Sequence, residues 1–366
     1  MLLLTVMMML LAPAGDGGNP QHGSPARAVV IAHRGASALR PEHTLAAYAL
    51  AIDDGADFVE PDLVSTKDGV LVARHENEIG ATTDVSKHPE FLVRKTRKDI
   101  DGGSIEGWFT EDFTLAELKT LRARERLPKL RGTHYDGDFE IPTLVEIIDL
   151  VAAKSARAGR PIGLIPEIKH SGYFRQHGLP IEDRLLEDLA AHAYTRQAPI
   201  IIQSFEATSL RYLRSRLGRD RRNISLLQLL GAPKGRPADQ RMSANGSTYA
   251  DMMTPEGLRQ IAGYAQSIGP ALHTVIPWDN HRRLGQPTPL VRDAHAAGLK
   301  VFPYTLRPEN RFRAAQFRQG ASPDVENEVG SIAEIRAYLD AGIDGFFIDD
   351  PALGRKAVDG WQRKER

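Results

Sequence analysis

Short apolar runs rich in β-branched residues alternate with longer amphipathic segments from residue 28 to residue 348. The apolar runs predict β-strands at residues 28–32, 58–64, 70–74, 162–168, 199–203, 224–229, 272–276, 301–305 and 346–348. The amphipathic segments predict helices at residues 44–53, 144–153, 181–193, 208–216, 290–297 and 332–339. Strands that alternate with helices form a parallel sheet, and about eight such units predict an α/β fold of the TIM (β/α)₈ barrel type. A doubly wound open sheet is the alternative.

Nine candidate strands compete for eight places in such a barrel. Residues 65–69 (STKDG) are too few for a parallel crossover, so the strand after them, the third, can be irregularly placed. Residues 77–140 interrupt the alternation with many charges, scattered aromatic residues and one clear helix at 115–124. This segment is too long for a structureless loop. It predicts a small insertion subdomain after the third strand, lying over the C-terminal face of the barrel, where active sites form.

Both ends of the chain differ from the repeating middle. Residues 1–14 (MLLLTVMMMLLAPA) combine an apolar run with a small-residue Ala-x-Ala pattern, which predicts a signal peptide. No Lys or Arg precedes the run. Residues 15–27 are a polar Gly/Pro linker, residues 28–354 the barrel domain and residues 355–366 a C-terminal tail. We therefore expect an exported, periplasmic protein without stable membrane insertion.

The charge balance and the missing cysteines exclude several classes of protein. The 47 basic and 47 acidic residues cancel, which argues against a nucleic-acid binder. The sequence has no Cys, which excludes disulfides, thiolate zinc sites, iron–sulfur clusters and cysteine nucleophiles. It also lacks the P-loop, H-E-x-x-H and nucleophile-elbow patterns.

Charged residues follow four of the predicted strands, where an unpaired buried charge would be costly. The first strand ends in His33 and Arg34, and the second contains Glu60 and Asp62, whose side chains point the same way. Two such close carboxylates repel each other unless a cation or a proton lies between them. With oxygen ligands only, the cation would be Ca²⁺ or Mg²⁺. Each pair also has a purely structural alternative. His33 and Arg34 could simply end a strand with their hydrogen bonds satisfied, and Glu60 and Asp62 could lie on the solvent-exposed face of an edge strand.

His75 ends the third strand, and Glu167 and Lys169 share one face of the fourth. Taken alone, the histidine would be structural and the other two an internal ion pair. Taken with the residues of the first two strands, these side chains describe a phosphate site. A cation, an arginine and a lysine stabilise charge on a phosphoryl group, and two histidines supply an acid and a base.

Several motifs occur in order between about residue 28 and residue 354. They are His33-Arg34-Gly35-Ala36-Ser37, Pro41-Glu42-His43-Thr44, residues 55–64, residues 66–75, Pro166-Glu167-Ile168-Lys169, Gln203-Ser204-Phe205, residues 302–307 and residues 342–351. In these motifs the sequence resembles the glycerophosphodiester phosphodiesterase family, in particular its exported bacterial type. The family's fold is a TIM barrel with an insertion of the kind inferred above.

The resemblance implies roles for individual residues. It implies that Glu60, Asp62 and Glu167 bind Ca²⁺ or Mg²⁺, and that His33 and His75 are the acid–base pair. It places Arg34 and Lys169 on the substrate phosphate, Tyr304 and Arg307 in contact with substrate, and Glu42 in support behind them. Two departures stand out. Glu76 replaces the usual Asp or Asn, and His43 replaces the frequent Asn, which can alter the hydrogen bonds behind the metal ligands.

The resemblance implies hydrolysis of glycerophosphodiesters, such as glycerophosphocholine, to sn-glycerol 3-phosphate and an alcohol. The attacking oxygen belongs either to water or to the glycerol itself, which would first form a cyclic phosphate. The alternatives are a lyase-type phospholipase D on the same barrel, a non-catalytic exported binding protein for phosphate esters, and an envelope or adhesion protein that uses the barrel as a scaffold.

Overall fold

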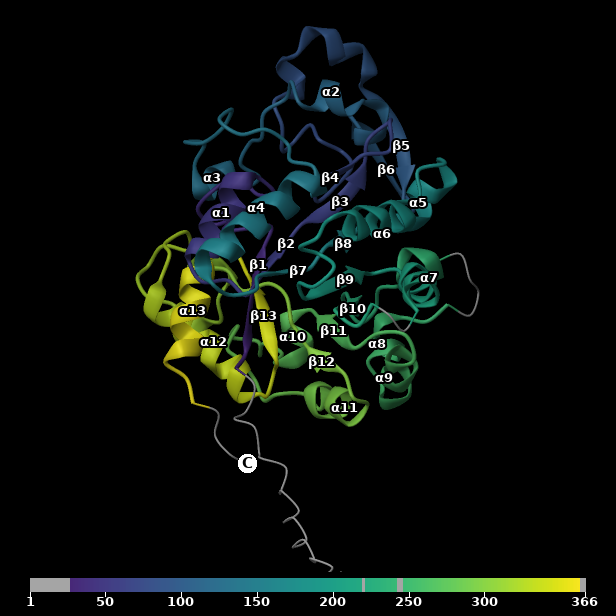
Figure 1. Ribbon diagram of the computed structural model, residues 1–366. Coiled ribbons are helices and arrows are strands. Elements are labelled where there is room, and N and C mark those ends of the chain that lie inside the picture. The colour runs from purple at the N-terminus through teal and green to yellow at the C-terminus, as the bar shows by residue number, and fades with distance from the viewer. Residues whose placement is uncertain (1–26, 219–220, 242–245, 363–366) are drawn as a thin grey trace, which may run out of the picture.

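The strands of the main sheet follow one another around a barrel (Figure 1). The computed structural model describes residues 27–218, 221–241 and 246–362. Its main sheet has eleven strands. They are β1 (Val29–His33), β2 (Phe58–Glu60), β3 (Asp62–Ser65), β4 (Leu71–Ala73), β7 (Gly163–Leu164), β8 (Glu167–Ile168), β9 (Ile200–Ser204), β10 (Ile224–Leu230), β11 (Ser267–Pro270), β12 (Lys300–Val301) and β13 (Gly345–Ile348).

Eight of these strands pair in parallel with their neighbours, in the order β12-β11-β10-β9-β7-β2-β1-β13. Individual backbone hydrogen bonds, rather than a continuous ladder, join the two outer strands. The N–H groups of Asp344 and Phe347 donate to the carbonyls of Val301 and Pro303, both at 3.0 Å. These bonds bring the two edges of the sheet together. The fold is therefore a TIM barrel, as the sequence predicted, and the open sheet is excluded.

Two of the predicted strands are each interrupted by a proline. The run at 58–64 forms β2 and β3 on either side of Pro61, and the run at 162–168 forms β7 and β8 around residues 165–166. Proline has no N–H to donate to a ladder, so the pairing changes there. Strand β2 pairs with β1 and β7, whereas β3 pairs with β8 and β4. The strand predicted at 70–74 is β4. It pairs antiparallel with β3 and is not one of the eight parallel strands of the barrel.

The strand predicted at residues 272–276 is wrong. The structure has a short helix there, α10 (Leu272–Val275), and the barrel strand is β11, just before it. The hydrophobic pattern did not predict β11, because its sequence, Ser-Ile-Gly-Pro, contains only one large apolar residue. Gly269 is needed at this place, since a Cβ atom would lie 2.7 Å from Leu229 Cδ2 and 2.9 Å from Leu227 Cδ2.

The helices lie outside the barrel (Figure 1). All six predicted helices are present, with ends moved by a few residues. None of the described helices combines the length and the apolar character needed to cross a membrane. The helices are α1 (Leu45–Asp53), α2 (Leu115–Leu118), α3 (Pro128–Arg131), α4 (Leu144–Ala158), α5 (Ser171–Gln176), α6 (Ile181–Ala191), α7 (Ala207–Leu217), α8 (Tyr249–Met252), α9 (Pro255–Ala262), α10, α11 (Leu290–Ala296), α12 (Glu328–Asp340) and α13 (Pro351–Asp359).

Two features of the helices bear on the expected domain limits. Helix α13 packs against β1 and α12 and continues to Asp359, past the boundary expected at residue 354. The expected signal peptide (1–14) and nearly all of the linker (15–27) lie outside the described residues.

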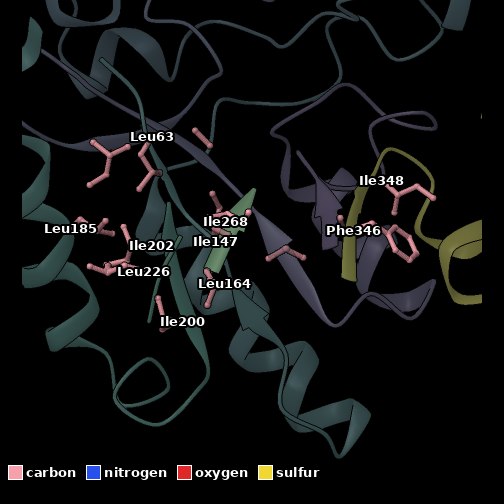
Figure 2. Close-up of a cluster of buried hydrophobic side chains, with 14 of the residues drawn as sticks. Leu63, Ile147, Leu164, Leu185, Ile200, Ile202, Leu226, Ile268, Phe346 and Ile348 are labelled. Carbon is pink, nitrogen blue, oxygen red and sulfur yellow. The ribbon is translucent and has the colours of Figure 1, made fainter. Parts of the chain in front are cut away.

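Side chains of the barrel strands form two separate hydrophobic layers. One layer lies between the strands and the surrounding helices, and Figure 2 shows part of it, including Leu164, Ile202 and Phe346 from strands and Ile147 and Leu185 from helices. The other layer fills the inside of the barrel. It consists of Ile31, Ile165, Ile201, Leu227, Leu229, Phe302 and Phe347, with Val29, Phe58, Phe205 and Tyr304 packed against it.

Residues 77–140, called the insertion below, project from one end of the barrel (top of Figure 1). They contain a separate antiparallel hairpin of β5 (Thr96–Ile100) and β6 (Gly103–Gly107), together with α2 and α3. The helix predicted at 115–124 is shorter in the structure and ends at Leu118. The insertion contains buried aromatic residues, among them Phe109 and Phe113, which belong to the same hydrophobic cluster as the outer layer of the barrel.

Candidate active site

Inward-facing positions change from apolar to polar along the barrel strands. Because side chains alternate along a strand, the residue two places after an inward apolar residue also faces inward. Ile31 is thus followed by His33, Phe58 by Glu60, and Ile165 by Glu167. The same alternation leads from Ile201 to Gln203, and from Phe347 to Asp349. These polar side chains meet above the inner hydrophobic layer, at the C-terminal ends of the strands.

Glu60, Asp62 and Glu167 form a buried acidic cluster. Each offers an oxygen atom, and these atoms lie within 4.8 Å of one another. Asp62 and Glu167 are direct neighbours in the pairing of β3 with β8. Glu60 accepts hydrogen bonds from Gln203 Nε2 at 3.1 Å and from the backbone N–H of Arg34 at 2.7 Å. The interruption at Pro61 thus places three carboxylates from β2, β3 and β8 around one point.

Burial and mutual repulsion disfavour the ionised form of two of these three carboxylates. Burial, with the neighbouring carboxylates, raises the pKa of Glu60, and burial raises that of Glu167 to about 8 despite Lys169. For Asp62, Lys169 and His43 overcome the effect of burial and lower the pKa. Asp62 Oδ1 is buried and has no hydrogen-bond partner among the described residues. Three carboxylates with one free oxygen fit a hard divalent cation such as Ca²⁺ or Mg²⁺.

His33 and His75 lie near this cluster, at the ends of β1 and β4. His33 Nδ1 is 2.6 Å from Asp349 Oδ1, and His75 Nδ1 is 2.5 Å from Glu76 Oε1. An ionised carboxylate can only accept, so each Nδ1 carries the proton and each Nε2 is left to exchange one. Burial and Arg34 lower the pKa of His33 to about 4, and burial and Lys169 also lower that of His75. Both imidazoles are therefore neutral at neutral pH.

Arg34 and Lys169 supply the positive charge beside the cluster. Arg34 is in the left-handed region (φ 59°) and is followed by Gly35 (φ 87°), which turns the chain sharply after β1. Its Nη1 donates to Glu42 at 2.8 Å, and its Nε lies 3.5 Å from Asp62 Oδ2. Lys169 Nζ donates to Glu167 at 2.8 Å. Both side chains are buried and adjoin the proposed metal ligands, as a phosphate site requires.

Glu42 and His43 lie behind the cluster. Glu42 accepts hydrogen bonds from Arg34 and from Arg126 of the insertion, the latter at 2.8 and 2.6 Å. His43 Nε2 is 2.9 Å from Asp62 Oδ2, and its Nδ1 is 2.8 Å from the hydroxyl of Tyr48. The imidazole at position 43 therefore fixes the orientation of Asp62, one of the three candidate metal ligands.

Tyr304 and Arg307 both lie at the rim of the same site, but their side chains have different partners. The Tyr304 hydroxyl donates to the carbonyl of Leu230 at 3.0 Å, and its ring meets Phe205 edge-on. Arg307 Nε lies 3.2 Å from Asp349 Oδ2, beside His33. Arg307 therefore has a direct charge partner in the site, whereas the hydroxyl of Tyr304 is already engaged.

Four residues with clear contacts in the site were given no role from the sequence, although the first two lie in segments that carry the family resemblance: Gln203, Asp349, Arg126 and Arg131. The alternation along β9 and β13 predicts inward positions for the first two, so the hydrophobic pattern contained their signal. The two arginines lie in the insertion, where no regular pattern connects them with the barrel strands. Only the folded chain shows their partners.

Comparisons with known proteins show the family to which the chain belongs. Residues 33–353 match the model of the glycerophosphoryl diester phosphodiesterase family. A glycerophosphodiester phosphodiesterase of Arabidopsis thaliana is 36% identical over 335 residues, which cover 87% of this chain and 82% of the relative. One from Haemophilus influenzae is 27% identical over 98% of this chain and its own full length.

Solved structures share the fold. A glycerophosphoryl diester phosphodiesterase structure from Silicibacter pomeroyi has a TM-score of 0.61 at 22% identity, covering 92% of this chain and 95% of its own. A phosphodiesterase from Oleispira antarctica, solved with its product sn-glycerol-3-phosphate, has a TM-score of 0.56 at 21% identity, covering 91% and 98%. The chain belongs to the glycerophosphoryl diester phosphodiesterase family and is an enzyme with glycerophosphodiester phosphodiesterase activity.

Proposed function

We propose that this enzyme hydrolyses deacylated phospholipids such as glycerophosphocholine to sn-glycerol 3-phosphate and the free alcohol. In this proposal the reaction depends on Ca²⁺ or Mg²⁺, and His33 and His75 are the acid–base pair. The observation that carries the proposal is the buried cluster of Glu60, Asp62 and Glu167 with two histidines beside it.

Arg34 and Lys169 bind and orient the phosphodiester in this mechanism. Their guanidinium and ammonium groups adjoin the acidic cluster, so the non-bridging oxygens of the substrate meet positive charge. Glu60, Asp62 and Glu167 would hold a divalent cation, whose charge would stabilise the transition state. Burial strengthens each of these interactions, because little water screens them.

The histidines move the protons. The Nε2 atom of one imidazole accepts the proton of the attacking hydroxyl as the new P–O bond forms. The other imidazole, protonated beside the anionic substrate, donates its proton to the leaving oxygen as the old P–O bond breaks. An opposite charge nearby favours the protonated form, so the bound phosphodiester raises the pKa of an imidazole that is neutral in the free enzyme. One proton is taken up and one is released, and the enzyme returns to its starting charge.

The test is the release of sn-glycerol 3-phosphate from glycerophosphocholine. The full chain is assayed with Ca²⁺, with Mg²⁺ and with excess chelator, alongside His33→Ala, His75→Ala and Glu167→Gln. We expect no release in chelator, at least 100-fold slower release for each histidine variant, and at least tenfold weaker metal binding for Glu167→Gln. Full activity after exhaustive chelation would refute the metal role, and full activity of both histidine variants would refute the acid–base assignment.

A further inference from the structure

Each histidine of the proposed acid–base pair has a carboxylate behind it. Asp349, at the end of β13, lies behind His33, and Glu76 lies behind His75. For Asp349, burial opposes ionisation, but Arg131 and His33 outweigh it and lower the pKa well below its usual range. Such a carboxylate fixes the tautomer and the plane of the imidazole, so its own orientation matters for catalysis.

Both carboxylates are held by arginines from one short segment of the insertion. Arg126 Nη1 and Nη2 donate to the two oxygens of Glu76 at 3.1 and 2.6 Å. Arg131, the last residue of α3, donates from Nη2 to Asp349 Oδ2 at 2.7 Å. Two residues five positions apart thus reach the supports of two histidines that lie on different strands.

Each arginine is also anchored on a second barrel loop. Arg126 donates to both oxygens of Glu42, which in turn accepts from Arg34. Arg131 donates from Nε to Glu309 at 2.7 Å and from Nη1 to the carbonyl of Ser37 at 2.8 Å. Paired, planar contacts of this kind fix a carboxylate in place as well as neutralising it.

Burial distinguishes most of these contacts from ordinary surface ion pairs; the Arg126–Glu76 pair is partly exposed, at 26% and 35% for the two side chains. The side chain of Arg131 is 7% exposed and that of Asp349 is 3% exposed. The side chain of Arg126 is 26% exposed, and that of its partner Glu42 is 6% exposed. Surface pairs contribute little, but breaking a buried pair leaves a charge without compensation.

We propose that residues 126–131 form a two-arginine clamp, in which Arg126 and Arg131 are positioning residues that orient the two histidines through their carboxylate partners. The insertion then completes the catalytic geometry in addition to covering the barrel. This inference rests on the proposed acid–base role of the histidines. Neither arginine is assigned a contact with the reacting atoms.

Replacing each arginine by alanine is expected to change the kinetics in a different way. Arg131 contacts Asp349, the support of His33, and none of its hydrogen-bond partners contacts the phosphate-binding Arg34 or Lys169, although Asp349 also contacts Arg307. Arg131→Ala should therefore lower kcat 10- to 100-fold and change KM less than Arg126→Ala does. Arg126 also holds Glu42 and, through it, the phosphate-binding Arg34. Arg126→Ala should therefore lower kcat by a similar factor and raise KM as well. Guanidinium ion added at millimolar concentration should restore part of kcat in each variant, because it can occupy the vacated place.

Arg124→Ala is the matched control. This arginine lies in the same part of the insertion, but its Nε contacts only Asp136, at 3.4 Å. We expect kcat and KM within twofold of the unaltered enzyme. If an alanine variant does not fold, as judged by circular dichroism, the lysine variants Arg126→Lys and Arg131→Lys replace it. A lysine keeps the charge but loses the paired contacts, so kcat should still fall at least fivefold.

The outcomes separate the clamp from the proposed function. If His33→Ala and His75→Ala are inactive but folded arginine variants keep kcat within twofold, the clamp is refuted and the acid–base assignment stands. The clamp is also refuted if guanidinium restores nothing, or if Arg131→Ala changes only KM. If the histidine variants remain active, the proposed function fails first.

Discussion

Gly163 provides a direct test of how closely β2 and β7 are packed beneath the buried acidic cluster. It pairs with Phe58 between β7 and β2, and a Cβ atom at this position would lie 2.1 Å from Phe58 Cε1 and 2.3 Å from Cδ1. Ordinary carbon contacts are about 3.5–4 Å. In Gly163→Ala the ring of Phe58 or the strand itself must therefore retreat by more than about 1 Å.

The expected cost follows from that displacement. Phe58 packs against the inner hydrophobic layer of the barrel, so its ring cannot move without disturbing the residues it contacts. Overpacking of this kind typically costs about 1–3 kcal/mol. We therefore expect Gly163→Ala to lower the free energy of unfolding by that amount. In urea this is seen as a lower midpoint concentration at an unchanged m-value.

A double variant isolates the steric cause. Phe58→Leu removes the ring atoms that the new methyl group would meet, so Phe58→Leu/Gly163→Ala should lose at least 1 kcal/mol less than the sum of the two single changes. Gly103→Ala is the control, because its nearest contact would be 3.6 Å away, and its stability should change by less than about 0.5 kcal/mol. If Gly163→Ala is as stable as the unaltered protein, or the two changes simply add, the reasoning is refuted.

Three further predictions follow from single residues. Arg74 is 1% exposed and donates to four backbone carbonyls, so Arg74→Met should cost roughly 3 kcal/mol in urea unfolding, and a loss below 1 kcal/mol would contradict this. Burial and Arg34 lower the pKa of His33 from 6.5 to about 4. The folded protein therefore binds fewer protons between these pH values, and its stability should fall by up to about 3 kcal/mol as the pH drops from 7 to 4. Thermal unfolding at several pH values should show a shallower slope for His33→Gln, and an equal slope would contradict the assignment. Gly35 has φ 87° and a Cβ there would lie 2.7 Å from the Ala47 backbone, so Gly35→Ala should lower kcat at least tenfold; unchanged kinetics in the release assay would contradict this.

The hydrophobic pattern was sufficient to predict most of the barrel because inward and outward positions alternate in a regular way. Where it failed, a specific packing requirement outweighed the pattern. Strand β11 contains Gly269 because Leu227 and Leu229 already fill the space inside the barrel, and a strand with so little apolar surface leaves no trace in the pattern. The prolines at 61 and 166 lie within otherwise apolar runs, so each broken strand was predicted as a continuous one.

The candidate site could be predicted where a side chain lies on a strand and not where it depends on the insertion. Glu60 and Glu167 come together because parallel strands end at the same edge of the sheet, which follows from sequence order alone. The contact of Arg131 with Asp349 joins residues 218 positions apart. No periodicity in the insertion specifies that approach, because it depends on the tertiary packing of an irregular segment.

Because β1 pairs with β13, the barrel can close only late in the synthesis of the chain. His33 and Asp349 are separated by 316 positions, nearly the whole described chain. At about 5–20 residues per second, a ribosome needs roughly 15–60 s to travel between them. Throughout that interval the growing chain has His33 without the carboxylate with which it forms a hydrogen bond, and a sheet whose first strand has one edge open. On the proposed mechanism, catalysis begins only after β13 has been synthesised, so a chain that stops before Asp349 is expected to be inactive, and activity itself reports that synthesis has passed this strand.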